Sequence, residues 1–359
     1  MPGNLYAKLT IFTMSVLSFQ PSKVTRALRS GLSDRAQDVI TSRYGLGGKD
    51  ETETLESIGN RYGITRERVR QIEADALRQI RESDVYSQEK ETFSELEEVF
   101  HSLGVIVPEE HFLNHISNRK STHNHVYLLL DLDDAFTRHR GDEHFHDRWH
   151  IDNRVASAIH SALEKLHSEL ELDELISEEE MVERFVNHIT DMPDDHSHHL
   201  DNEEVLRRWL ALSRKVDENP LGEWGHADSS NVRVKGVRDY AYLVIRKHGS
   251  PLHFREVTKE IKNLFEKKAH EATTHNELIK DDRFVLVGRG LYALKEWGYM
   301  TGVVREVIEK IIKRDGPLTR DEVVDKVLKE RYVKPNTVIV NLQNEDNFKK
   351  SGDGKYNVA

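Results

Sequence analysis

The chain has 359 residues, of which 37% are hydrophobic and 32% charged, and its formal net charge at pH 7 is −11. That length predicts two to four domains. The absence of cysteine excludes disulfides and cysteine-ligated metals, and no stretch approaches the roughly 20 apolar residues of a membrane-spanning helix. We therefore expect a cytoplasmic protein with no membrane contact.

The acidic charge is concentrated in the middle of the chain. Residues 91–232 carry 12 Lys and Arg against 32 Asp and Glu, whereas residues 1–90 and 233–359 have net charges of +2 and +7. Because phosphate repels an acidic surface, we expect any DNA contact at the two ends. The acidic segment 91–232 is then a spacer, a protein-binding surface or a segment that reduces nonspecific DNA binding.

Residues 1–22 are expected to be an N-terminal extension. Their apolar string LTIFTMSVLSF is short, follows a single lysine and lacks a clear small-residue cleavage site. We therefore do not interpret it as a signal peptide.

The string TLESIGNRYGITRERVRQIEADALRQIRE, residues 54–82, predicts a helix, a tight turn and a second helix. Gly63 suits the left-handed turn, and Thr65 is a good N-cap for the second helix. A helix-turn-helix presents the first turns of its second helix to the DNA major groove. The candidate DNA-binding residues are Thr65, Arg66, Glu67, Arg70 and Gln71. Arg78 and Arg81, farther along the same helix, are expected to contact phosphates.

This region resembles a known family. LSDRAQDVITSRYGLGGKDETETLESIGNRYGITRERVRQIEADALRQIR, about residues 32–81, is similar to the sigma-70 class domain (region 4) that reads the −35 promoter element. The resemblance implies that Arg66, Glu67, Arg70 and Gln71 contact bases and adjacent backbone, with Arg61 and Arg68 as weaker phosphate candidates. It also implies double-stranded DNA and the β flap of core RNA polymerase as partners.

The chain also departs from this family. Sigma factors carry, upstream, aromatic-rich domains that bind the polymerase clamp and melt the −10 element, and only about thirty residues precede the motif here. We therefore expect either a regulator that contains only the −35-reading domain of a sigma factor or a protein that acts together with another factor.

An internal repeat with a period of roughly 65–75 residues organises the rest of the chain. HGSPLHFREVTKEI aligns with RDGPLTRDEVVDKV, and Gly290 and Tyr292 align with Gly354 and Tyr356. Each unit predicts helices followed by a glycine-tipped hairpin, the pattern of a winged helix. The expected fold is mainly α with small β-hairpin wings. The predicted domains are a helix-turn-helix (23–86), two acidic winged-helix-like units (91–151 and 153–232), and two further winged helices (236–298 and 302–359).

The unit at 236–298 carries a second resemblance. GVRDYAYLVIRKHGSPLHFREVTKEI and FVLVGRGLYALKEWGY are similar to the HARE-type helix-turn-helix domain, a family that includes the delta subunit of bacterial RNA polymerase. The resemblance implies a wing-bearing fold that binds DNA or a transcription protein. The basic residues of this unit are equally compatible with phosphate contact and with a solvated face: Lys259, Lys262, Lys267, Lys268, Arg289 and Lys295.

Signatures of catalysis are missing: the sequence has no P-loop, GxSxG, HExxH or dinucleotide fingerprint. We expect no enzyme activity and no cofactor. Sixteen of the twenty histidines lie between residues 101 and 226, and they favour a solvated surface over a metal site. As a weaker hypothesis, neighbouring carboxylates raise the histidine pKa values and make the segment a pH sensor.

Two functional classes remain open. The first is a sigma-like transcription regulator that reads a −35-type element, with later units on DNA or polymerase, in the nucleoid. The second is a delta-like adaptor that binds RNA polymerase mainly through protein contacts. The sequence does not determine the oligomeric state.

Overall fold

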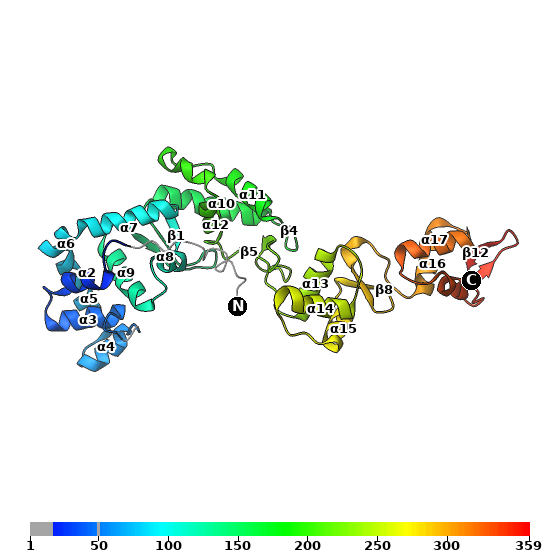
Figure 1. Ribbon diagram of the computed structural model, residues 1–359, viewed down its shortest axis with the longest axis horizontal. Coiled ribbons are helices and arrows are strands. Elements are labelled where there is room, and N and C mark those ends of the chain that lie inside the picture. Colours follow the sequence, from blue (N-terminus) through cyan, green and yellow to red (C-terminus); the bar gives the residue numbers. More distant parts are fainter. Residues whose placement is uncertain (1–16, 49–50) are drawn as a thin grey trace. The chain divides into compact units, whose positions relative to one another are not determined.

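The computed structural model describes residues 17–48 and 51–359, which form a mainly α-helical protein with four small antiparallel sheets (Figure 1). The expectation of a mainly α fold with small β elements is confirmed. The expected N-terminal extension lies outside the described residues up to position 16. None of the described helices is both long and apolar enough to cross a membrane.

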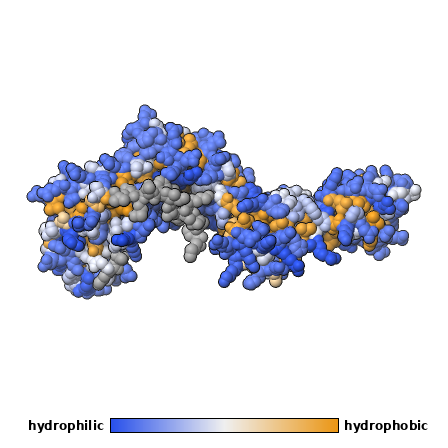
Figure 2. Space-filling model, viewed as in Figure 1, coloured by the Kyte–Doolittle hydropathy of each residue, from blue (hydrophilic) through white to orange (hydrophobic). Residues whose placement is uncertain are grey.

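The chain divides into two compact units. The first unit runs to Glu218 and includes Gly222–Ser229, and the second comprises Asn219–Leu221 and Ser230–Ala359. Hydrophilic side chains cover most of the visible face of both units (Figure 2). The apolar residues that hold each unit together are therefore mainly internal.

The described part of the first unit begins with five helices: α2 (Pro21–Arg29), α3 (Asp34–Tyr44), α4 (Leu55–Tyr62), α5 (Arg66–Arg81) and α6 (Asp84–Gln88). Local sequence signals set their ends. The Ser33 side chain accepts from the backbone N–H of Ala36 at the start of α3, and Gly45 ends that helix at φ 65°, which glycine adopts without steric cost.

Four segments then follow the same order of helix, strand, helix, helix, strand and strand, and we call each segment a repeat. The first repeat contains α7 (Lys90–Leu103), β1 (Ile106–Pro108), α8 (Glu109–Ile116), α9 (Lys120–Leu132), β2 (Thr137–His139) and β3 (Arg148–His150). The second contains α10 (Asn153–Glu169), β4 (Leu175–Ile176), α11 (Glu178–His188), α12 (Glu203–Leu210), β5 (Val216–Glu218) and β6 (Trp224–His226), with the short helix η2 (Asp194–Asp201) before α12.

The second unit holds the other two repeats. The third contains α13 (Val237–His248), β7 (Leu252–His253), α14 (Phe254–Phe265), α15 (Glu271–Lys280), β8 (Phe284–Gly288) and β9 (Leu291–Leu294), followed by η3 (Lys295–Trp297). The fourth contains α16 (Val304–Asp315), β10 (Leu318–Thr319), α17 (Arg320–Glu330), α18 (Pro335–Leu342), β11 (Phe348–Lys350) and β12 (Lys355–Val358).

The four sheets share one topology. In each of them the last strand of the repeat lies between the other two. An aromatic residue of that central strand faces an aliphatic residue of the first strand, a cross-strand pair that stabilises small sheets. The four pairs are Val107 with Trp149, Ile176 with Trp224, Leu252 with Tyr292, and Leu318 with Tyr356.

The core of the first unit runs through the boundary predicted at residues 86–91. One apolar cluster joins Val24, Leu28 and Ile40 of the N-terminal helices to Phe100 of α7 and Leu128 of α9. Helices α2, α3, α5 and α6 and the first repeat are therefore packed around a common core.

Candidate nucleic-acid interface

The turn between α4 and α5 is fixed by short-range contacts. The Thr54 side chain accepts from Ser57 N at the start of α4, Gly63 ends α4 at φ 65°, and the Thr65 side chain accepts from Arg68 N at the start of α5. A Cβ built on Gly59 would lie only 2.7 Å from the carbonyl oxygen of Ile64. The turn is therefore too tight for any larger residue at Gly59 without a backbone shift.

A small apolar cluster sets the orientation of α5. Val39 of α3, Ile58 of α4 and Val69 of α5 are fully buried against one another. Because Val69 and the half-buried Ile72 face this cluster, the exposed side chains of residues 66–68, 70 and 71 point away from the protein. This is the orientation that the second helix of a helix-turn-helix needs to enter a major groove.

The structure brings five of the predicted residues together on that outward face. Arg66, Glu67, Arg68, Arg70 and Gln71 are all exposed. An Arg70 guanidinium nitrogen lies 2.6 Å from a carboxylate oxygen of Glu67, and Arg68 donates to the Gln71 side-chain oxygen at 3.0 Å. The hydrogen bonds from Arg70 lower the pKa of Glu67, so that this carboxyl is ionised and only accepts.

The other predicted residues lie at different places. Thr65 caps α5, and Arg78 is exposed two turns farther along the helix, where it is paired with Asp75. The Arg61 guanidinium lies on α4 and donates to Asp38 at 2.7 Å and to Glu53 at 3.2 Å. Arg61 thus ties α4 to α3 and to the preceding loop, and a phosphate would compete with two carboxylates for it.

Arg81, which was expected to contact phosphate, has partners inside the protein in this structure. Its guanidinium donates to the carbonyl oxygens of Asp131 at 2.7 Å and Leu132 at 2.9 Å. These carbonyls belong to the last turn of α9, where a helix leaves acceptors unsatisfied and favours a positive charge. Arg81 therefore links α5 to the first repeat.

Sequence reasoning did not identify Arg43 as part of the interface. A hollow of about 360 Å³ beside the start of α5 is lined by Arg43, Thr54, Leu55, Glu56 and Arg66. Arg43 comes from α3 and is held by Glu73 at 3.0 Å and by the Glu53 carbonyl oxygen at 2.7 Å. It is 23 positions before Arg66, so only the fold brings the two guanidinium groups to one hollow.

The α9 helix packs against α3 and α5 of the helix-turn-helix region. The Asn124 side chain donates to the Gly45 carbonyl oxygen at 3.0 Å, and the Tyr44 hydroxyl donates to Asp131 at 2.8 Å. Leu128 is fully buried and lies between Asn124 and Asp131 on the same helical face. A partner that used the apolar faces of α2, α3 and α5 would therefore have to displace α9.

The histidines do not behave as the sequence suggested. Burial lowers the pKa of His111 and of His150 to about 4, and that of His160 to about 3. It also outweighs the nearby carboxylates, because desolvation penalises the charged ring. The expectation of raised histidine pKa values is wrong for these residues. No group of three or more His, Asp and Glu within residues 17–48 and 51–359 is arranged to hold a metal ion.

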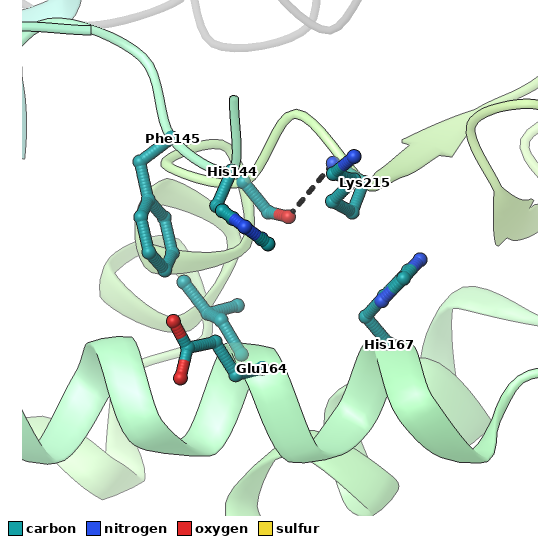
Figure 3. Close-up of a pocket in the computed structure, with 7 residues that line it drawn as sticks. His144, Phe145, Glu164, His167 and Lys215 are labelled. Atoms are coloured by element: carbon teal, nitrogen blue, oxygen red, sulfur yellow. Dashed lines mark hydrogen bonds between the residues drawn. The ribbon is translucent and has the colours of Figure 1, made fainter. Parts of the chain in front are cut away.

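A second hollow, of about 280 Å³, lies where the first and second repeats meet (Figure 3). Glu164 and His167 rise from α10 toward it, and His144, Phe145 and Lys215 face them (Figure 3). The Arg214 N–H donates to the His144 carbonyl oxygen at 2.7 Å beside it. This hollow is therefore part of a seam between repeats, far from α5 in the sequence.

The comparisons with known proteins concern the region that contains α5. Residues 30–82 match the family described as Sigma-70, region 4. Over 50 residues the chain is 52% identical to the RNA polymerase sigma factor SigA of Listeria monocytogenes serovar 1/2a (strain ATCC BAA-679 / EGD-e). That alignment covers 14% of this chain and 13% of the sigma factor, so the chain matches about an eighth of this relative's length.

The resemblance to region 4 is thus confirmed, and we call residues 30–82 the region 4 domain. The match includes α3, α4 and α5, and with them every predicted DNA-binding residue. The resemblance of residues 236–298 to a HARE-type domain stays a prediction, as do the winged-helix assignment and the domain boundaries.

Proposed function

We propose that the protein is a sigma-like DNA-binding regulator of transcription that reads a −35-type promoter element with the first two turns of α5. The observation that supports this most directly is the outward face of α5 inside a region 4 match, with Arg66, Glu67, Arg70 and Gln71 exposed. Under this proposal the protein acts in the cytoplasm at the nucleoid, by binding and without catalysis.

The chemistry of the exposed side chains fits base recognition. Arginine can donate two hydrogen bonds to guanine, glutamine can pair with adenine, and glutamate can accept from cytosine. In the free protein Arg70 and Glu67 pair with each other. An exposed pair of this kind contributes little free energy, so base contacts can replace it at small cost.

We also propose that core RNA polymerase is a partner, as it is for the region 4 family. The repeats are inferred to be winged helices that contact DNA or polymerase, the third being HARE-like. The alternative is a delta-like adaptor that binds polymerase mainly through protein contacts. Substitutions of the exposed residues of α5 would then have little effect on its function.

The double substitution Arg70→Ala with Gln71→Ala tests the proposal. The full chain is titrated, by fluorescence anisotropy, with the duplex that the unaltered protein selects from a randomised pool. Loss of two base contacts should weaken this binding by on the order of 100-fold, since each good contact discriminates by roughly 5- to 100-fold. Binding to an unrelated duplex should change much less.

The same helix offers a matched control, because Arg78 and Gln79 repeat the residue pair two turns later and are both exposed. Arg78→Ala with Gln79→Ala should reduce the salt dependence by about one phosphate contact and leave the choice of sequence unaltered. If both double variants select the same sequences as the unaltered chain, α5 does not read bases. Retained binding of the Arg70 and Gln71 variant to core RNA polymerase would then favour the adaptor.

A further inference from the structure

In the first unit, neighbouring elements cover the third helix of each repeat. The α9 helix packs on the region 4 domain, as described above. In α12, Arg208 donates to the Leu103 carbonyl oxygen at 2.6 Å and Trp209 Nε1 donates to the Gly104 carbonyl oxygen at 2.9 Å, both at the end of α7. Both helices are thus held against neighbouring parts of the first unit.

In the third repeat, the hairpin is engaged by the fourth. Tyr332 N donates to the Val287 carbonyl oxygen at 2.8 Å, and the Arg331 guanidinium donates to the Leu286 carbonyl oxygen. The third helix, α15, begins with Glu271 and also carries Glu277. Glu271 lies 3.2 Å from the Arg255 guanidinium, so a phosphate that approached this end of the helix would compete with a carboxylate for Arg255.

The fourth repeat differs from the third in both its third helix and its hairpin. Its third helix, α18, has the sequence PNTVIVNL with no charged side chain, and Pro335, Asn336, Thr337 and Val340 are exposed. Val338 and Leu342 anchor the helix in a core with Phe348. Lys334 precedes the helix as its N-cap residue, and the β11–β12 hairpin carries exposed Lys349 and Lys350.

The exposed groups on this surface suit a DNA duplex. Asparagine can pair with adenine, threonine with several bases, and an apolar side chain such as Val340 can meet a thymine methyl group. Lysines on a flanking hairpin are suited to phosphate. Glu345 and Asp346 lie beyond the C-terminal end of α18, whereas a recognition helix reads bases with its N-terminal residues.

We propose that the fourth repeat is a second DNA-binding surface, with α18 in the major groove of double-stranded DNA and Lys349 and Lys350 on the phosphate backbone. It does not depend on base reading by α5, because it rests on different residues in the other unit. The protein would then hold two segments of duplex at once, and each contact would raise the effective concentration of the other.

The test measures the salt dependence of duplex binding by the full chain. With a random-sequence duplex and increasing KCl, Lys349→Ala with Lys350→Ala should reduce the slope of log Kobs against log salt by about two. Lys267→Ala with Lys268→Ala in the third repeat removes the same charge and should reduce the slope by less than half as much. Equal reductions would overturn the proposal, because net charge alone would then explain them, and so would an unchanged slope in the fourth-repeat variant.

Two further variants separate this site from α5. In the background of Arg70→Ala with Gln71→Ala, the remaining salt-dependent binding should persist and should then fall with Lys349→Ala and Lys350→Ala. Asn336→Ala with Thr337→Ala should change the sequences selected from a randomised pool without altering the salt slope. Selected sequences identical to those of the unaltered chain would mean that α18 does not read bases, which overturns this part of the proposal whatever α5 does.

Discussion

The helices α9 and α18 occupy the same position in their repeats and face opposite environments. In α9, six residues of the thirteen are buried and the helix lies against the region 4 domain. In α18, two residues of the eight are buried and the rest of the helix contacts solvent to some degree. One fold thus uses its third helix either as part of a shared core or as an open surface.

The sequences of the two helices show how this difference arises. The run LLLDL in α9 has apolar side chains all around the helix, which is typical of a helix buried on several sides. In α18 the inward residues Val338 and Leu342 are one turn apart, so a single apolar stripe is enough to hold the helix. The first unit should therefore respond to changes in burial, and α18 should tolerate them.

The largest expected effect is a loss of stability of the first unit in acid. The pKa values of His111 and His150 in the folded first unit are lowered to about 4, and that of His160 to about 3. As the pH falls below 6.5, the unfolded chain takes up protons that the folded chain does not bind. The free energy of unfolding should fall by ~2 kcal/mol per histidine at pH 5 relative to neutral pH.

Urea unfolding monitored by the tryptophan fluorescence of the first unit measures this loss between pH 7 and pH 5. His160→Gln is the matched variant, because its amide oxygen can still accept from Arg148 Nε, which lies 2.7 Å from His160 Nε2. This variant should lose less stability in acid than the unaltered chain, and the difference should be ~2 kcal/mol, the contribution of one histidine. A flat pH profile for the unaltered chain would show that these rings are not buried in solution.

The next largest effect is expected from truncating buried leucines. Leu128→Ala in α9 should lower the free energy of unfolding of the first unit by about 2–5 kcal/mol, because it removes a fully buried side chain and leaves a cavity. Val340→Ala in α18 should change stability by less than about 0.5 kcal/mol, since that side chain is 57% exposed.

Hydrogen exchange shows whether packing of α9 stabilises the region 4 domain. In the Leu128→Ala variant, the amides of α3 and α5 should exchange faster, together with those of α9. If only the amides of the first repeat respond, the region 4 domain is stable by itself and α9 is no more than an attached helix.

The local structure that the sequence predicted correctly depends on short-range signals. The cap at Thr65, the turn at Gly63 and the exposure of Arg70 lie within a few residues of one another, and local chemistry determines them. The partners of Arg81 and the lowered histidine pKa values were not predicted, because the environments of these residues come from distant segments. The Arg81 partners are 50 and 51 residues away, and histidine burial depends on packing between repeats.

The smallest expected difference in stability is between substitutions of two asparagines in the third helices. Asn124 is buried in α9 and donates to the Gly45 carbonyl oxygen 79 residues away, whereas Asn341 in α18 donates to the Thr337 carbonyl oxygen one turn earlier. Asn124→Ala leaves that carbonyl without its donor and should cost about 1–2 kcal/mol of the stability of the first unit. Asn341→Ala loses only a local contact and should stay within about 0.5 kcal/mol, measured by urea unfolding of each unit. Equal costs at the two positions would mean that the hydrogen bond from Asn124 to the region 4 domain contributes no more to stability than a contact within one helix.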